Sequence, residues 1–217
     1  LYQSISQKII KVSSTRAAEM TKLLENTFRA TNIGLINEMA MICEKLELDI
    51  WEIIEAAKTK PYGFMPFYPG PGLGGHCIPI DPRYLDWKLQ TLNSESKYIK
   101  LSEEINFSMP HYVLSRIKKI KEKNKLENNP LIVFGVSYKA NVSDIRESPA
   151  IDLLKLFYEE NIDFIYNDPY VKTLNIDGRI YNSEPLSDKL LQEAKLGIIT
   201  TDHSDYNWEY ITNNISY

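Results

Sequence analysis

The sequence predicts a helical first half followed by an α/β second half built around a parallel sheet. In the first half, apolar residues recur at intervals of three and four, as they do along one face of a helix. In the second half, short apolar segments alternate with an amphipathic segment, a pattern typical of a doubly wound sheet. The basic, polar stretch KKIKEKNKLENN separates the two patterns. We therefore predict two domains, at residues 1–125 and 126–217.

The composition is that of an ordinary globular protein, with 43% hydrophobic and 25% charged residues among 217. A net charge of -4 gives no reason to expect a nucleic-acid partner. No apolar run approaches the roughly 20 residues that span a bilayer, and the N-terminus does not resemble a signal peptide. With only two cysteines and no Cys/His cluster, neither a disulfide framework nor a metal site is expected. We expect a cytoplasmic protein without a membrane partner and, because the chain begins at Leu1, a piece of a longer one.

The predicted elements of the first half are helices joined by one unusual loop. A long helix, or two helices with a bend, extends from Ser14 to Leu48, and Asp49 caps a second helix that Pro61 ends. Six of the eleven prolines and five of the nine glycines lie between Pro61 and Pro82. Neither a helix nor a central strand tolerates that density, so this segment is a loop with a specific shape.

The remaining elements follow from shorter patterns. Asp81 and Pro82 resemble the N-cap and first turn of a third helix, and a fourth begins near Ser94 and extends to Phe107 before Pro110 interrupts it. In the second half, residues 130–138, 162–169 and 196–204 resemble strands, and residues 151–160 resemble an amphipathic helix.

Cys77 is the candidate nucleophile, because it ends the glycine-rich loop GPGLGGHCIPIDP. Glycines let the backbone approach a ligand, and a thiol presented after such a turn is accessible for attack. The alternative is a small buried side chain, which the local pattern supports equally. Cys43 lies within a helical apolar stripe and is assigned to the core. His76 adjoins Cys77 in sequence, which is weak support for a catalytic dyad.

Two polar groups are candidates for binding oxygen atoms. Lys22 and Asn26 are four residues apart, so they share one helix face and could reach the same oxygen, although spacing alone favours a solvated polar face. In GVSYKANVSDIRESPA, Lys139, Arg146 and the turn at Ser148 could bind phosphate. A plain strand-to-helix connection is the alternative. With one glycine, this segment is not a G-x-G-x-x-G dinucleotide site.

Three segments together resemble the UDP-glucose and UDP-N-acetylhexosamine dehydrogenase family over nearly the whole chain: KLLENTFRATNIGLINEMA, PGPGLGGHCIPIDP and GVSYKANVSDIRESPA. The loop looks most similar to the UDP-N-acetylglucosamine 6-dehydrogenase branch. The resemblance implies an all-α central domain that forms a homodimer and a Rossmann-like UDP-binding domain. The family's NAD-binding domain, with its G-x-G-x-x-G and a catalytic glutamate, has no counterpart in the sequence. We therefore expect NAD to be bound mainly by a missing domain, and the chain to be inactive alone.

The resemblance also implies roles for individual residues. Cys77 would be the nucleophile, Lys22 and Asn26 would stabilise oxyanion charge, and Asp81 would assist the attacking water. Arg146 would reach the NAD phosphates. Substrate-binding roles fall to the remaining candidates, which are Phe67, Tyr68, Gly74 and Lys139.

Three positions depart from the UDP-glucose branch. Asn32 and Ile80 stand where that branch usually has cations, and His76 stands where it has serine. Neutral groups reshape the pocket without removing the nucleophile, which favours an N-acetylated hexose over UDP-glucose, the alternative substrate. The product would be a uronate for surface polysaccharide. Two other classes stay open: a binding or dimerisation fragment without activity, and a cysteine hydrolase that would need a histidine partner.

Overall fold

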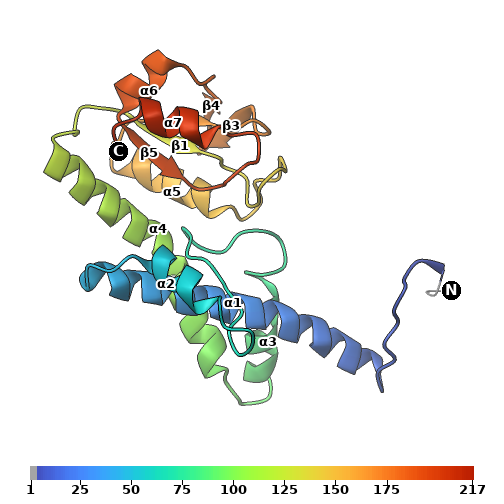
Figure 1. The fold of residues 1–217 in the computed structure, drawn as a ribbon. Coiled ribbons are helices and arrows are strands. Elements are labelled where there is room, and N and C mark those ends of the chain that lie inside the picture. Colours follow the sequence, from blue (N-terminus) through green and yellow to red (C-terminus); the bar gives the residue numbers. More distant parts are fainter. Residues whose placement is uncertain (1–3) are drawn as a thin grey trace.

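The computed structural model describes residues 4–217, and Figure 1 shows a helical layer below an α/β unit. Helix α4 extends from the first into the second. The predicted fold class, a helical part followed by a part with a parallel sheet, is confirmed. The helical part contains α1 (Thr15–Lys45), α2 (Ile50–Ala57), α3 (Asp81–Gln90) and α4 (Lys97–Asn124). The α/β part contains β1 (Leu131–Phe134), α5 (Pro149–Glu159), β2 (Phe164–Asn167), β3 (Thr173–Ile176), β4 (Arg179–Asn182), α6 (Asp188–Ala194), β5 (Leu196–Ile199) and α7 (Trp208–Asn214).

Helix α1 is one continuous element of 31 residues, so the alternative of two helices does not apply. The Ser14 hydroxyl caps its N-terminus by accepting the Ala17 N–H. Near its middle, α1 packs closely on α4: a Cβ added at Gly34 would lie 3.0 Å from the Ser102 Oγ. The absence of a side chain at Gly34 therefore lets the two long helices approach each other.

The predicted N-cap role of Asp81 is wrong. The N-cap of α3 is Ile80, which makes no side-chain capping bond, and Asp81 is the first helical residue, followed by Pro82. The Cys77 carbonyl accepts the Asp81 N–H at 2.8 Å, so backbone upstream of the helix already provides its first turn. The Asp81 carboxylate is thereby available for another partner.

The predicted interruption at Pro110 is also wrong, because α4 continues through it for 28 residues. Proline has no N–H, so it leaves the carbonyl of Asn106, four residues earlier, without its helical donor. Pro110 is buried, and beyond it Leu114 and Ile117 join the core of the α/β part. Packing on both sides thus holds α4 together across the proline.

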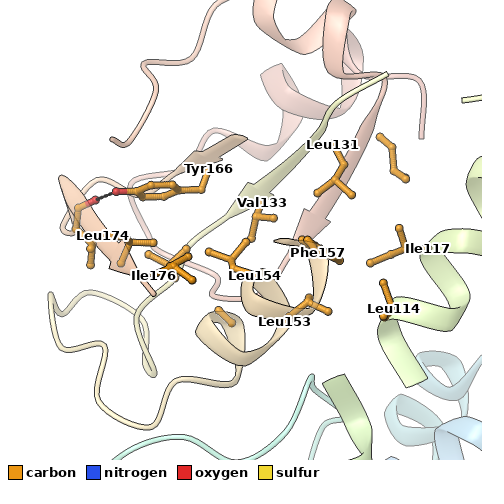
Figure 2. Close-up of a cluster of buried hydrophobic side chains, with 14 of the residues drawn as sticks. Leu114, Ile117, Leu131, Val133, Leu153, Leu154, Phe157, Tyr166, Leu174 and Ile176 are labelled. Atoms are coloured by element: carbon orange, nitrogen blue, oxygen red, sulfur yellow. Dashed lines mark hydrogen bonds between the residues drawn. The ribbon is translucent and has the colours of Figure 1, made fainter. Parts of the chain in front are cut away.

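The α/β part is a parallel three-stranded sheet in the order β2-β1-β5. Alternate residues of β1 point to opposite faces. Leu131 and Val133 pack with Phe157 of α5, as Figure 2 shows, whereas Ile132 and Phe134 pack with residues of α6 and α7. The sheet is therefore covered on both faces, and its central strand is wholly buried.

Four elements of the second half were not predicted from the sequence. Strands β3 and β4 form an antiparallel hairpin around Asp177-Gly178, and α6 and α7 are helices of seven residues each. Their short length explains why the helical period was not detected. No helix within residues 4–217 combines the length and apolar character that crossing a membrane requires.

Candidate active site

The glycine-rich loop between α2 and α3 lies between the two halves of the chain. A Cβ added at Gly74 would come within 2.9 Å of the Tyr138 Cβ and 3.0 Å of the Pro149 Cδ. Gly75 has a φ of +88°, and its added Cβ would lie 2.8 Å from the Tyr138 ring. Glycine is therefore required at both positions, once for space and once for space and backbone conformation. The atoms nearest to Gly74 lie close to the backbone of Tyr138 and Pro149 and have little freedom to move. Gly74 therefore helps to set the shape of the loop.

Cys77 is exposed, whereas Cys43 is buried with 2% of its surface accessible. The Cys77 carbonyl accepts N–H groups of both Ile80, at 3.2 Å, and Asp81, at 2.8 Å. The thiol is thus attached to a fixed turn that leads into α3. This location agrees with an accessible nucleophile and disagrees with the alternative of a small buried side chain.

Asn26 and Asp81 are brought together although 55 positions separate them. The Asn26 side chain is 4% exposed, and its Nδ2 donates a hydrogen bond to the Asp81 Oδ2. Since Asp81 follows the Cys77 turn directly, this bond joins α1 to the segment that carries the thiol. Three of the four predicted catalytic residues therefore lie in one locality.

Lys22 is the fourth, and it lies one helical turn before Asn26 on α1. Its side chain is 62% exposed, and its ammonium is 3.7 Å from the Glu25 carboxylate. Exposed ion pairs of this kind contribute little, so the ammonium is free to turn toward another anion. The structure places Lys22 on the Asn26 side of the helix without linking it to Cys77.

The two predicted aromatic residues of the loop have different neighbours. Phe67 packs edge-to-face on Phe28 of α1, with ring centroids 5.9 Å apart. Tyr68 stacks on Trp51 of α2 at 5.8 Å, and its hydroxyl donates to the Glu55 carboxylate at 3.2 Å. Phe67 is therefore close to the part of α1 that carries Asn26, whereas the contacts of Tyr68 are with α2.

Lys139 and Arg146 both belong to the connection between β1 and α5, which faces the glycine-rich loop through Tyr138. Lys139 is exposed. The Arg146 side chain is 64% exposed, and its Nη2 donates to the Asp144 carboxylate at 2.6 Å. This hydrogen bond lowers the pKa of Asp144 to about 2, and the charge of His76 acts in the same direction. Arg146 is thus held by a carboxylate of its own connection.

A buried network behind this connection was missed by the sequence analysis. Asp168 and His203 are both completely buried, with the His203 Nε2 3.1 Å from the Asp168 Oδ2. The His203 Nδ1 accepts the Asn141 N–H at 2.9 Å, so the ring proton must lie on Nε2, facing Asp168. Polar residues that follow β2 and β5, the two neighbours of β1, were the available signal. The network supports the connection that carries Lys139.

The same network bears on the cysteine-hydrolase hypothesis. His203 is committed to Asn141 and Asp168, and His76 is exposed near Asp144. Ser137 lies 3.4 Å from the His203 Nε2, yet it is 1% exposed and its hydroxyl donates to the Lys139 carbonyl. The pair of Ser137 and His203 is therefore buried and already hydrogen-bonded, and it does not provide an accessible nucleophile with a histidine base.

Two cavities lie beside the glycine-rich loop. One, of about 410 Å³, lies between the loop and α3, α4 and α5, and the other, of about 500 Å³, lies between α1, α2, α4 and the end of β5. None of the predicted site residues lines either cavity. The candidate site therefore lies outside these two cavities, with Cys77 exposed and Asn26 buried.

Comparison with known proteins gives matches over both halves. Residues 16–108 match the central domain of the UDP-glucose/GDP-mannose dehydrogenase family, and residues 132–215 match the UDP binding domain of the same family. An NDP-N-acetyl-D-galactosaminuronic acid dehydrogenase from Ralstonia solanacearum is 35% identical over 211 residues, which cover 95% of this chain and 47% of the relative. A UDP-N-acetyl-D-mannosamine dehydrogenase from Methanocaldococcus jannaschii is 36% identical over 95% of this chain and 45% of its own.

Solved structures agree with these relatives. A UDP-N-acetyl-mannosamine dehydrogenase from Staphylococcus aureus is 36% identical, with a TM-score of 0.80 over 100% of this chain and 49% of that one. A UDP-D-ManNAc dehydrogenase from Pyrococcus horikoshii is 30% identical, with a TM-score of 0.83 over 100% of this chain and 50% of that one. The chain thus spans about half the length of the relatives that it matches.

Proposed function

Because this chain belongs to the UDP-glucose/GDP-mannose dehydrogenase family, we propose that it provides the substrate-binding and covalent part of a nucleotide-sugar 6-dehydrogenase. The observation that carries the proposal is the hydrogen bond between Asn26 and Asp81 beside the exposed Cys77. It holds an amide and a carboxylate next to the turn that carries the thiol, and attack on an aldehyde and later hydrolysis require these three groups.

In the proposed reaction, the C6 alcohol of the sugar first loses a hydride and a proton and becomes an aldehyde. The thiolate of Cys77 adds to this aldehyde, and the resulting oxyanion takes up a proton to give a thiohemiacetal. Oxidation of this adduct gives a thioester, and water then breaks its carbon–sulfur bond, which releases the uronate and regenerates the thiol. Asn26 and Lys22 stabilise the negative charge on the reacting oxygen, and the loss of one such donor commonly costs on the order of 3 kcal/mol in the transition state. Asp81 orients the water.

NAD supplies the hydride acceptor for both oxidations in this proposal. Among the residues of this chain, Arg146 fits the dinucleotide phosphates, because its guanidinium is exposed and already oriented by Asp144. Gly135, the one glycine of the β1–α5 connection, has a different use: a side chain there would collide with Thr201. That glycine serves packing within the α/β part, which is consistent with NAD being bound mainly by residues outside this chain.

The proposed substrate is a UDP-N-acetylhexosamine. The second half matches a UDP-binding domain, and Lys139, Phe67, Tyr68 and Gly74 are the proposed substrate contacts. UDP-N-acetylglucosamine is the sugar that the loop sequence favours, whereas the relatives are named for N-acetylmannosamine and N-acetylgalactosaminuronic acid. UDP-glucose is the alternative from the same family. A cytoplasmic location and a role in surface polysaccharide synthesis complete the proposal.

The test uses the whole enzyme that carries this chain, supplied with NAD and one UDP-sugar at a time while NADH is followed. The four sugars are UDP-N-acetylglucosamine, UDP-N-acetylmannosamine, UDP-N-acetylgalactosamine and UDP-glucose. Cys77→Ser should abolish formation of the uronate, and Cys43→Ser is the matched control, because Cys43 is buried and outside the site. Retention of the wild-type NADH yield by Cys77→Ser would show that the nucleophile is misassigned. A preference for UDP-glucose over all three N-acetylhexosamines would overturn the substrate class.

A homodimer is the proposed assembly, and an apolar stripe along α1 supports it. The large apolar side chains of this stripe are each more than 40% exposed: Met20, Leu24, Phe28, Leu35, Ile42 and Leu46. Their spacing places them along one side of the helix, as a helix–helix interface requires. Light scattering on the chain should give a dimer mass, and Leu24→Glu with Leu35→Glu should give a monomer; a monomer at high concentration of the unmodified chain would refute this assembly.

A further inference from the structure

A buried relay of side-chain amides links the glycine-rich loop to the packed pair α1 and α4. The Gly70 N–H donates to the Asn37 Oδ1 at 2.9 Å, and the Asn37 Nδ2 donates to the Asn106 Oδ1 at 2.9 Å. The Asn106 Nδ2 then donates to the Ala30 carbonyl at 3.1 Å. Asn37 is 0% exposed and Asn106 is 4% exposed. Buried amides of this kind are costly unless their hydrogen bonds are made.

The direction of the relay is fixed by its two ends. A backbone N–H can only donate, so Asn37 must present its oxygen to Gly70 and its nitrogen to Asn106. A backbone carbonyl can only accept, so Asn106 must present its nitrogen to Ala30 and its oxygen to Asn37. Rotating either amide would bring two donors or two acceptors together. The arrangement is therefore determined by chemistry, without ambiguity between oxygen and nitrogen positions.

The relay contacts the loop at Gly70 and approaches it a second time at Gly72. A Cβ added at Gly72 would lie 3.3 Å from the Asn106 carbonyl oxygen, the atom that Pro110 leaves without a helical donor. The opposite side of the same glycine is bounded by Pro149 of α5, 3.1 Å from the added Cβ. The loop is thus fixed by α1 and α4 where it begins, and by the α/β part where it approaches Cys77.

We propose that Asn37 and Asn106 are positioning residues that set the path of the glycine-rich loop and thereby the place of Cys77. They do not contact the reacting atoms in this role; they act through the Gly70 N–H. The inference rests on the proposed function in giving Cys77 its catalytic importance, although the geometry of the relay does not depend on it. Helix α1 would then serve the site twice, with Asn26 at the carboxylate and Asn37 at the loop.

The test measures the rate at which the Cys77 thiol of the chain reacts with iodoacetamide, using mass spectrometry to separate the two cysteines. Cys43 is the internal reference, because it is buried in α1 and reacts only if the helical part opens. Asn37→Ala removes the acceptor, and Gly70→Pro removes the donor from the loop side without altering the helix interface. Because the Cys77 thiol is exposed, its rate depends on where the loop holds it, and each variant should change that rate severalfold, up to about the fivefold shift in equilibrium that the loss of a typical hydrogen bond produces.

Two controls match these variants. Gly70→Ala keeps the N–H, and nothing lies within 4 Å of the added Cβ; Ser102→Ala removes another bond to the Ala30 carbonyl without touching the loop. Both should leave the Cys77 rate near that of the unmodified chain. Combining the two variants should add nothing to the change that Asn37→Ala makes alone, because Asn37→Ala already removes the bond that Gly70→Pro removes.

Unchanged Cys77 labelling in Gly70→Pro, with Cys43 still protected, would overturn the inference, and so would additive effects in the combined variant. If Asn37→Ala exposes Cys43, the helical part has opened in that variant, and the labelling of Gly70→Pro then decides whether the relay positions Cys77. The labelling experiment needs neither NAD nor a sugar. Failure of the Cys77→Ser experiment on the whole enzyme would therefore remove the proposed function and leave the relay result standing.

Discussion

Replacing Asp168 with asparagine is the most direct test of the buried network behind the Lys139 connection. The Asp168 Oδ2 accepts the Val136 N–H at 2.7 Å and faces the His203 Nε2 at 3.1 Å. The Oδ1 accepts the Tyr170 N–H at 2.8 Å and the Val171 N–H at 2.9 Å. Every partner is a donor, so a carboxylate satisfies the site and an amide cannot. In either orientation, the new NH₂ group opposes at least two donors, since the Ser137 N–H also approaches the Oδ2 at 3.4 Å.

The magnitude follows from the number of bonds lost. Hydrogen bonds to a charged group contribute about 1.5–3 kcal/mol each, so two lost bonds cost roughly 3–6 kcal/mol. Removing the charge from a fully buried site lowers the desolvation cost, which offsets part of this loss. We therefore expect Asp168→Asn to reduce the free energy of unfolding by about 3 kcal/mol. A change of His203 tautomer does not relieve the loss, because Nδ1–H would then oppose the Asn141 N–H.

The assay is urea unfolding followed by tryptophan fluorescence in a chain that also carries Trp51→Phe and Trp87→Phe. Trp208 is then the one tryptophan left of three, and its ring packs edge-to-face on Phe134 of β1, so it reports on the α/β part. Asp152→Asn is the control, because its side chain is 58% exposed and its ion pair with Lys155 is weak. A loss below about 1 kcal/mol for Asp168→Asn would refute the assignment of the four contacts as stabilising bonds.

Three further predictions concern other positions. Gly135→Ala forces a residue with φ of +75° to carry a methyl group against the Thr201 carbonyl, so a loss of about 3 kcal/mol is expected; an unchanged melting temperature would contradict it. Arg146→Ala should raise the pKa of Asp144 from about 2 toward its usual range. Because the folded-state pKa is depressed, the pair favours folding above the ordinary carboxyl pKa and loses this effect as the pH falls toward 2; an NMR titration that shows no movement would exclude the contact. Burial, together with a hydrogen bond to a carboxylate, raises the pKa of Tyr112 to about 12. The ultraviolet absorbance of this tyrosine should therefore change only near that pH. Because the folded-state pKa is raised, the contribution of Tyr112 to folding should fall as the pH rises from the ordinary tyrosine pKa toward 12.

The fold could be predicted where hydrophobic periods were long. The apolar repeat of α1 and the run LIVF of β1 gave the correct element types and the parallel sheet. The predicted boundary at residue 125 stays a prediction, since Leu114 and Ile117 of α4 already pack into the second core. The strands β3 and β4 and the helices α6 and α7 were missed, because they are short and lack the continuous apolar run that marked the equally short β1.

Local rules failed where tertiary packing decided the outcome. Pro110 was expected to end a helix, but the packing around it compensates for one lost hydrogen bond. Asp81 matched the pattern of an N-cap, but a backbone carbonyl already provided the first turn. Neither result is visible in the neighbouring residues. The pairing of Asp81 with Asn26 is still less accessible to sequence patterns, because the two are 55 positions apart and meet through the packing of α1 against α3.

The exposure of the Cys77 thiol to solvent has a consequence for the proposed chemistry. Cys77, Lys22 and Arg146 are exposed, and neither cavity includes them. A thioester in contact with bulk water would hydrolyse without control, and charge stabilisation by the exposed Lys22 would be weakened by solvent. The proposed reaction therefore requires another surface to cover the thiol during turnover. If such a surface covers the thiol, the Cys77 labelling rate in the whole enzyme with NAD and sugar present should be far below that of the chain alone. Equal rates would mean that the thiol is never enclosed and that the covalent step must be reassigned.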